Sequence, residues 1–140
     1  MVTSKPLLQV TDLRAHFFGF KGRRVVKAVD GVSFTLDAGQ TLGLVGESGC
    51  GKTTTCHSIF RLLPGAGRIV GGSIQFDGAE LMEKSPGEMR EIRGRDMAMI
   101  PQDPMASLDP LFTIFDQVAE PAYIHRGLRR SALRERVVGL

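Results

Sequence analysis

Apolar residues in the first third of the chain come in short runs that polar turns interrupt. The runs at 8–13, 25–29 and 32–36 alternate with polar residues or are rich in valine, and Asp30-Gly31 separates the last two. Such runs favour β-strands joined by tight turns. The sequence therefore predicts an antiparallel β subdomain at its beginning.

Two later apolar runs have the pattern of strands that are buried on both faces. They cover residues 41–45 and 97–100, and each is short and continuous. Runs of this kind are typical of strands in a parallel sheet. A helix is predicted over 52–63, directly after the first run, and Pro64-Gly65 should end it. Strand followed by helix predicts an α/β fold with a parallel core sheet.

The remaining elements are one strand and three helices, predicted over 73–76, 87–94, 113–124 and from 132 onward. Thr113 and Ser131 have side chains that cap helix N-termini, because their hydroxyls accept from free amides. Pro121 should kink or shorten its helix, since proline has no amide donor.

Composition and charge place the chain among soluble globular proteins. It has 140 residues, of which 42% are hydrophobic and 24% charged, and its formal net charge is +3. Residues 126–140 alone carry five arginines against Glu135, so the rest of the chain is close to neutral. A nucleic-acid footprint normally spreads basic residues over a face. We therefore expect no nucleic-acid partner, and we interpret the basic end as a solvated helical face.

The cysteines and the lack of long apolar runs indicate the cellular compartment of the protein. Cys50 and Cys56 should point to different faces if the second lies on a helix, so we expect two unpaired thiols and a reducing, cytosolic setting. No apolar run approaches the ~18 residues that a membrane span needs, and no signal-peptide pattern is present. If the protein works at a membrane, another component must hold it there.

The richest chemical signal is the stretch Gly46-Glu-Ser-Gly-Cys-Gly-Lys52-Thr53, which fits the P-loop pattern. Glycines let successive amides turn inward and cradle phosphates, while the next helix directs its N-terminal dipole at them. Lys52 should bridge the β- and γ-phosphates of a nucleotide. The expected nucleotide-binding residues of this stretch are Gly46, Ser48, Gly49, Cys50, Gly51, Lys52, Thr53 and Thr54.

Two hydroxyl groups directly after Lys52 have expected roles. Thr53 should place its hydroxyl on Mg²⁺, and Thr54 should reach the α-phosphate. A glycine-rich turn with an exposed lysine is the structural alternative, but it has no need for Lys-Thr at this spacing. P-loop proteins include GTPases, kinases, helicases and transport ATPases. The sequence has no Asn-Lys-x-Asp motif for guanine, which disfavours a GTPase.

A second motif indicates which class of P-loop protein this is. Gln102 follows the predicted strand at 97–100, fifty residues after Lys52, in the wording Gln-Asp-Pro-Met-Ala-Ser-Leu-Asp-Pro. This resembles the Q-loop of the ATP-binding-cassette (ABC) ATPases, in particular their oligopeptide/dipeptide importer branch. The stretches Glu120-Pro121, His125-Arg126-Gly127 and 28–34 are similar to the same branch. The resemblance covers nearly the whole chain, from about residue 7.

The resemblance implies further roles. Gln102 would contact Mg²⁺ and the attacking water, so it joins Lys52 as a catalytic residue and Thr53 as a metal contact. It would also relay the γ-phosphate state to a loop that docks on a membrane permease. Phe17 stands where the family has an aromatic that stacks on adenine, although a shift of one residue would bring His16 or Phe18 there instead.

The family also needs groups that we do not find in the sequence. These are an apolar strand followed by Asp-Glu, a Leu-Ser-Gly-Gly-Gln signature and a later histidine for the γ-phosphate. The chain therefore resembles an incomplete nucleotide-binding domain, with its β and P-loop core over about 1–102 and the start of a helical subdomain over about 102–140. Its fold class is expected to be α/β of the P-loop NTPase type, truncated in that helical subdomain.

Three functions remain open at this stage. The first is an ATPase that energises import of peptides or similar solutes; the second is a non-hydrolysing nucleotide-binding fragment or decoy subunit; the third is a small P-loop kinase, which the Q-loop disfavours. For the first, the resemblance implies ATP and Mg²⁺, two permease subunits, a second ATPase subunit and an extracytoplasmic solute-binding protein. It also implies a peripheral position on the cytoplasmic face of the membrane. Peptide, nickel and glutathione all stay open as the transported solute.

Overall fold

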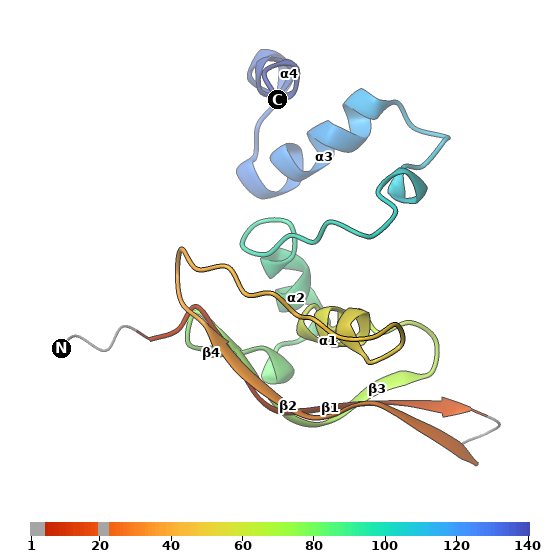
Figure 1. Cartoon of the computed structure of the whole chain (residues 1–140). Coiled ribbons are helices and arrows are strands. Elements are labelled where there is room, and N and C mark those ends of the chain that lie inside the picture. Colours follow the sequence, from red (N-terminus) through yellow and green to blue (C-terminus); the bar gives the residue numbers. More distant parts are fainter. Residues whose placement is uncertain (1–4, 20–22) are drawn as a thin grey trace. The chain divides into compact units, whose positions relative to one another are not determined.

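The computed structural model describes residues 5–19 and 23–140, and the chain divides into two compact units. They are Met1–Lys84 and Ser85–Leu140 (Figure 1). Each is described by itself.

The first unit is built on an antiparallel sheet. Its strands are β1 (Leu8–Gly19), β2 (Arg24–Leu36), β3 (Gly67–Phe76) and β4 (Ala79–Glu80), in the order β2-β1-β3-β4. Helix α1 (Lys52–Ile59) lies over one face of this sheet (Figure 1), and a short 3-10 helix, η1 (Leu81–Glu83), follows β4. The predicted antiparallel β subdomain is therefore confirmed.

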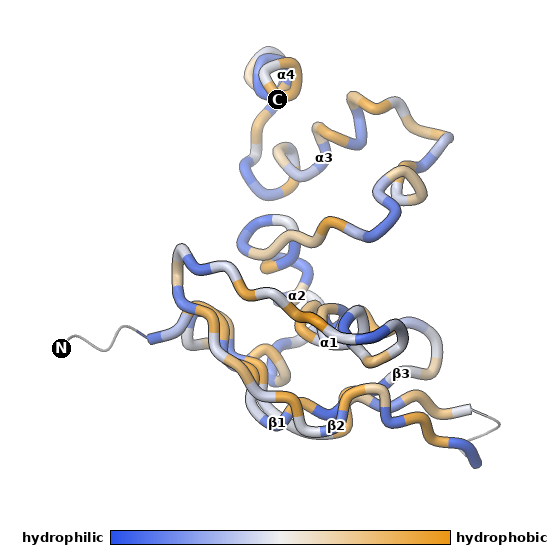
Figure 2. The backbone as a smooth tube through the Cα atoms, in the orientation of Figure 1, coloured by the Kyte–Doolittle hydropathy of each residue, from blue (hydrophilic) through white to orange (hydrophobic). Residues whose placement is uncertain are grey.

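The core of this unit comes from alternate positions of the long strands. Hydrophobic and hydrophilic positions interleave along them (Figure 2), and the buried side chains include Val10, Leu13, Val29 and Ile74. Leu13 and Ile74 are fully buried. Burial of such a side chain stabilises the fold by roughly 1.5–3 kcal/mol compared with leaving it exposed.

The strands are longer than the sequence pattern predicts. The two strands expected at 25–29 and 32–36 are one strand, β2, and the predicted turn at Asp30-Gly31 lies inside it. The ladder with β1 shifts register between Leu13 and Arg14, next to this point, and Gly31 has a φ of 90°. A glycine with positive φ at a register shift lets the chain continue as a bulged strand instead of reversing.

The predicted parallel strands are the main difference from the sequence analysis. Residues 41–47 carry no strand ladder, and Leu42 and Val45 are exposed. In the other run, Met97 forms an isolated parallel bridge with Arg93 and residues 98–100 form none. A strand needs a hydrogen-bonded neighbour, and the described residues supply none beyond that bridge.

Helix α1 is shorter than predicted because a side chain fixes the turn after it. The helix ends at Ile59, and Arg61 adopts a φ of 51°. The Arg61 guanidinium donates to the carbonyl oxygens of Leu81 at 2.8 Å and Lys84 at 2.5 Å. These long-range bonds hold the chain in a turn at a position where the sequence pattern predicts further helix.

The second unit is helical. It contains α2 (Pro86–Ile92), the 3-10 helix η2 (Met105–Ser107), α3 (Ile114–Arg126) and α4 (Arg130–Val138). Ser85 and Glu88 form a capping box on α2. No helix in the described part of the chain is long and apolar enough to cross a bilayer.

One of the two helix caps predicted for this unit is present in the structure, and the other is not. Thr113 caps α3 by accepting from the Asp116 amide at 3.1 Å, as predicted. Ser131 does not cap α4, because that helix begins at Arg130 after Arg129. Helix α3 runs through Pro121 to Arg126. Pro121 is exposed, so water can reach the helix surface where a backbone hydrogen bond is missing.

Candidate functional site

The predicted phosphate loop closes around Lys52, the first residue of α1. The Lys52 Nζ donates to the carbonyl oxygens of Gly46 at 2.8 Å and Glu47 at 2.7 Å. The sulfur of Cys50 lies 3.5 Å from the same nitrogen. These contacts hold the ammonium group inside the curve of the loop, so that positive charge is concentrated there.

The backbone of the loop requires glycine at its end. Gly51 has a φ of 93°, and a Cβ built on it would lie 2.2 Å from the Ala28 carbonyl oxygen. At Gly46 a Cβ would lie 2.6 Å from the Cys50 sulfur. Side chains at these positions would push the loop off β2 or open its curve. The glycine pattern is thus explained by close packing as well as by access for a ligand.

The N-terminus of α1 offers unpaired donors. Its N-cap is Gly51, so no side chain caps the first amides, and its first turn holds no acidic residue. Among the described residues, the amides of Lys52 and Thr53 have no hydrogen-bond acceptor. Free amides together with the helix dipole favour an anion at this end. The loop therefore fits a phosphate group in both charge and donor supply.

The three threonines after Lys52 have different environments. Thr53 is exposed, and its hydroxyl has no partner among the described residues. Thr55 is buried and donates its hydroxyl to the Gly51 carbonyl at 3.0 Å. Ser58, also buried, donates to the Thr54 carbonyl at 2.7 Å. Thr55 and Ser58 fix the helix under the loop, a role that sequence analysis missed because their burial depends on the sheet.

Phe17 lies on β1, opposite Val26 of β2 and Gly67 of β3. A Cβ built on Gly67 would come within 2.9 Å of the Phe17 ring, so the ring occupies the space over that glycine. The ring is half-buried. Phe17 thus packs within the sheet, whereas the loop residues gather around Lys52.

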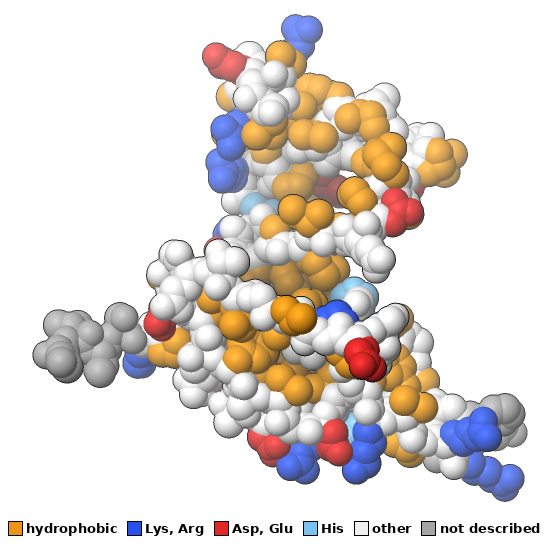
Figure 3. Space-filling view, viewed as in Figure 1, with side chains coloured by type: hydrophobic (Ala, Val, Ile, Leu, Met, Phe, Trp, Pro, Cys, Tyr) orange, Lys and Arg blue, Asp and Glu red, His pale blue; other side chains and the backbone are white. Residues whose placement is uncertain are grey.

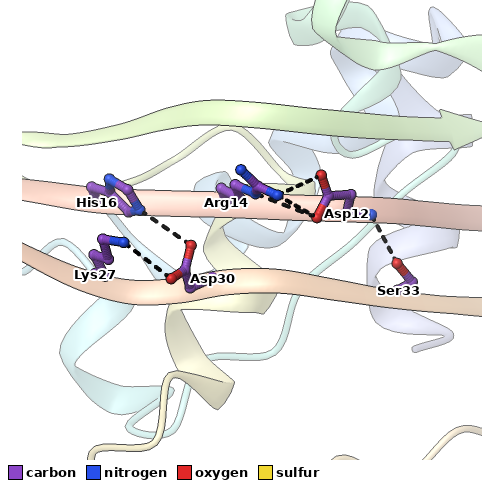
Figure 4. Close-up of polar contacts among 6 residues, drawn as sticks. All are labelled: Asp12, Arg14, His16, Lys27, Asp30 and Ser33. Atoms are coloured by element: carbon purple, nitrogen blue, oxygen red, sulfur yellow. Dashed lines mark hydrogen bonds and ion pairs between the residues drawn. The ribbon is translucent and has the colours of Figure 1, made fainter.

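The neighbouring candidate, His16, is engaged in a polar cluster. Its Nε2 lies 3.8 Å from an Asp30 carboxylate oxygen, and Lys27 reaches the same carboxylate at 3.3 Å (Figure 4). The side chain of His16 is 14% exposed. His16 is therefore tied to Asp30 by this contact, whereas Phe17 packs over Gly67.

Gln102 belongs to the second unit. It is exposed and lies in a bend before η2. The following residue, Asp103, accepts from the Ala106 amide at 3.3 Å and so shapes the turn. The loop that carries Gln102 is ordered by local hydrogen bonds.

Comparison with known proteins identifies a family and close relatives. Residues 29–138 match the family described as ABC transporter. The chain is 47% identical over 133 residues to the "Probable peptide ABC transporter ATP-binding protein y4tR" of Sinorhizobium fredii, covering 94% of this chain and 39% of that protein. It is 42% identical over 135 residues to the dipeptide transport ATP-binding protein DppD of Bacillus subtilis, covering 96% and 40%. The chain thus spans about 40% of the length of the curated relatives it matches.

A solved structure supports the fold. The dimeric structure of MJ0796, a bacterial ABC transporter cassette, superposes with a TM-score of 0.77 over 94% of this chain and 53% of that one. The sequences are 21% identical, so the likeness concerns the fold alone. It confirms the predicted α/β class, in which a β subdomain precedes a helical part.

Proposed function

Because the chain belongs to the ABC transporter family, we propose that it binds ATP with Mg²⁺ at residues 46–54, as part of an ATPase that drives solute import. The observation that carries this proposal is the loop around Lys52. There the loop holds the Lys52 ammonium group against the Gly46 and Glu47 carbonyls, directly before a helix whose first amides are free.

The loop residues have distinct roles in this proposal. The amides of Ser48, Gly49, Gly51 and Lys52 would donate to phosphate oxygens, and Cys50, whose amide donates to the Glu47 carbonyl at 3.3 Å, would hold the turn beside them. Lys52 exchanges its bonds to Gly46 and Glu47 for the β- and γ-phosphates, which are stronger partners because they are charged. Thr53 offers a free hydroxyl to Mg²⁺ and Thr54 faces the α-phosphate. Mg²⁺ held there would neutralise part of the phosphate charge.

Two residues outside the loop complete the proposed site. Phe17 offers a ring for the adenine base, since a half-buried aromatic on a strand is a rigid platform. Gln102 would hold the attacking water and Mg²⁺ through its amide, which has both an acceptor and donors. Both roles are carried over from the family pattern.

We propose that residues 1–140 alone bind nucleotide without efficient turnover. The sequence has no apolar strand ending in Asp-Glu and no Leu-Ser-Gly-Gly-Gln segment. Phosphoryl transfer depends on several positioned charges acting together.

The names of the relatives support a proposal for the solute and the partners. Proteins similar to this chain carry names for peptide and dipeptide transport, so peptides are the solute class we propose. The expected partners are two permease subunits, a second ATPase subunit and a solute-binding protein that acts through the permease. The chain would then sit on the cytoplasmic face of the membrane, held by the permease.

Substitution of Lys52 tests nucleotide binding. We expect Lys52→Ala to weaken binding of a fluorescent ATP analogue by at least about 100-fold, because two or more charge-assisted contacts of about 1.5–3 kcal/mol each are lost. Lys27→Ala is the matched control, since that exposed lysine bonds to Asp30 and lies outside the loop; it should leave affinity unchanged.

Two outcomes would contradict the proposal. If Lys52→Ala and the unsubstituted chain bind the analogue with equal affinity, the loop is not the binding site. ATP hydrolysis by residues 1–140 that disappears in Lys52→Ala would show that the chain is a complete catalyst, against the expectation of slow turnover.

A further inference from the structure

The basic end of the chain is not used by the proposed nucleotide site. Residues 126–140 carry five arginines, and two of these, Arg126 and Arg136, line a pocket of about 260 Å³ within the second unit. The other basic side chains of the pocket are His125 and Arg95, and no acidic residue of the described chain lines it. Figure 3 shows arginine side chains along one flank of this unit, with a histidine side chain beside them. Positive charge is therefore concentrated around one small pocket.

A turn at residues 93–97 forms one wall of the pocket. The Gly94 amide donates to the Met97 carbonyl at 2.8 Å, which closes the turn. Gly94 has a φ of 85°, and a Cβ built on it would lie 2.8 Å from Nε2 of His125, which belongs to the last turn of α3. The imidazole therefore packs directly on the glycine. Contacts of this kind fix the wall before a ligand arrives, which lowers the entropic cost of binding.

The arginines of the pocket differ in whether their charge is already matched. The Arg95 guanidinium binds the Asp96 carboxylate, with the shortest contact at 2.8 Å, and these hydrogen bonds lower the pKa of Asp96. Arg126 and Arg136 have no hydrogen bond or ion pair among the described residues. Two positive charges therefore line the pocket without a counter-charge.

Helix dipoles account for only part of this charge. Arg126 lies in the last turn of α3 and Arg136 in the last turn of α4, where a basic residue complements the negative end of the dipole. That end amounts to about half an elementary charge. Two guanidinium groups thus exceed two helix ends by about one positive charge, which is available to an anion from outside the chain.

We propose that this pocket binds a phosphate monoester group. Such a group carries a charge of about −1.5 to −2 and three acceptor oxygens, and a guanidinium group matches phosphate oxygens with parallel donors. Val118, Pro121 and Ala122 give the pocket an apolar side, which suits the organic part of the ester.

The size of the pocket limits the ligand. Sites for drug-sized ligands begin at about 300 Å³, so a small phosphorylated solute fits this pocket better than a nucleotide does. A soluble sugar phosphate and the head group of phosphatidic acid present the same phosphate chemistry. The pocket belongs to the second unit and shares no residue with the loop around Lys52, so the inference does not depend on the proposed function.

Arginine labelling measures occupancy of the pocket residue by residue. The full 140-residue chain is treated with phenylglyoxal, and mass spectrometry reports the labelling of each arginine. We expect glycerol phosphate to protect Arg126 and Arg136 saturably. Arg134 should stay labelled, because it lies on the same helix as Arg136 but does not line this pocket. Dimethyl phosphate, a diester with a single charge, should need at least about a tenfold higher concentration, since hydrogen bonds to charged oxygens are the stronger ones.

Variants locate the site. Arg126→Gln should raise the concentration of glycerol phosphate that half-protects Arg136 about tenfold, the loss expected for one charge-assisted hydrogen bond. Arg134→Gln is the matched control and should leave that concentration unchanged. Lys52→Ala should also leave it unchanged while losing the ATP analogue, so failure of either site is seen separately.

Vesicles distinguish the two sources of the phosphate group. Protection by glycerol phosphate supports a soluble ligand. Protection only by phosphatidylcholine vesicles that contain phosphatidic acid, and not by phosphatidylcholine alone, assigns the same group to a lipid. The proposal is overturned if neither source protects the two arginines, if Arg134 is protected at the same concentrations, if the diester protects equally well, or if Arg126→Gln leaves the protection of Arg136 unchanged.

Discussion

Gly49 and Gly51 both have a positive φ, 82° and 93°, but their surroundings differ. A Cβ on Gly49 would have no atom within 4 Å, whereas one on Gly51 would strike the Ala28 carbonyl oxygen at 2.2 Å. We expect Gly49→Ala to lower the free energy of unfolding by about 1–2 kcal/mol, the cost of a left-handed conformation. Gly51→Ala should lower it clearly further, because main-chain atoms cannot move aside cheaply. Urea denaturation measures both.

This pair is its own control, since the residue types and the conformational strain are the same. Equal losses of stability would show that the loop does not approach β2 at Ala28 as described.

The same contrast shows how far single residues can be predicted from sequence. The glycine-rich turn and the start of helix α1 at Lys52 are predictable because their sequence signals are local. The packing of Phe17 on Gly67 is not predictable in this way, because fifty residues separate them and the strand register decides the contact. The burial of Thr55 depends on the sheet for the same reason.

At the scale of elements, Glu80 joins β3 to η1. Its carboxylate accepts from the Ser73 hydroxyl and from the amides of Ile74 and Met82, each amide at 3.0 Å. Partial burial by itself would raise the pKa of Glu80, but these hydrogen bonds outweigh it and hold the pKa below the ordinary value of 4.5. The charged form is therefore favoured by the fold.

A depressed carboxyl pKa gives a defined pH dependence of stability. The contribution of Glu80 is present above its unfolded pKa of 4.5 and is lost as the pH falls from there through the lower folded pKa. We expect Glu80→Gln to show a smaller fall in unfolding free energy over that acid range than the unsubstituted chain. Glu83→Gln, in the 3-10 helix that Glu80 caps, should keep the original slope. Identical slopes for all three proteins would contradict a stabilising role for the Glu80 carboxylate.

Elements were predicted correctly where nearby residues determine them, and wrongly where pairing between distant strands determines them. Helix α3 begins at its Thr113 cap as predicted, since capping needs only nearby residues. The turn predicted at Asp30-Gly31 is wrong, because β1 offers a continuous partner on both sides of the bulge. The apolar run at 41–45 has a strand's composition, but a strand forms only where another strand pairs with it.

At the scale of the whole molecule, that run has a consequence for solution behaviour. Val45 is 97% exposed, Leu42 and Leu44 are 42% and 39% exposed, and their main chain carries no ladder among the described residues. An apolar, unpaired extended segment is a template for pairing with another chain. We expect the 140-residue chain to self-associate with rising concentration, seen as an increase of apparent mass in light scattering.

A charge placed on the segment should reduce that association. Val45→Lys puts an ammonium group on the exposed strand-like surface, where pairing with a second copy would bring two such groups together or bury them. Val70→Lys is the matched control, because Val70 is also exposed, at 45%, but belongs to β3, which pairs with β1 along this stretch. We expect the apparent mass of Val45→Lys to stay near 15.2 kDa at concentrations where the unsubstituted chain and Val70→Lys associate. If Val70→Lys suppresses association equally, general repulsion explains the effect and the unpaired segment is not its cause.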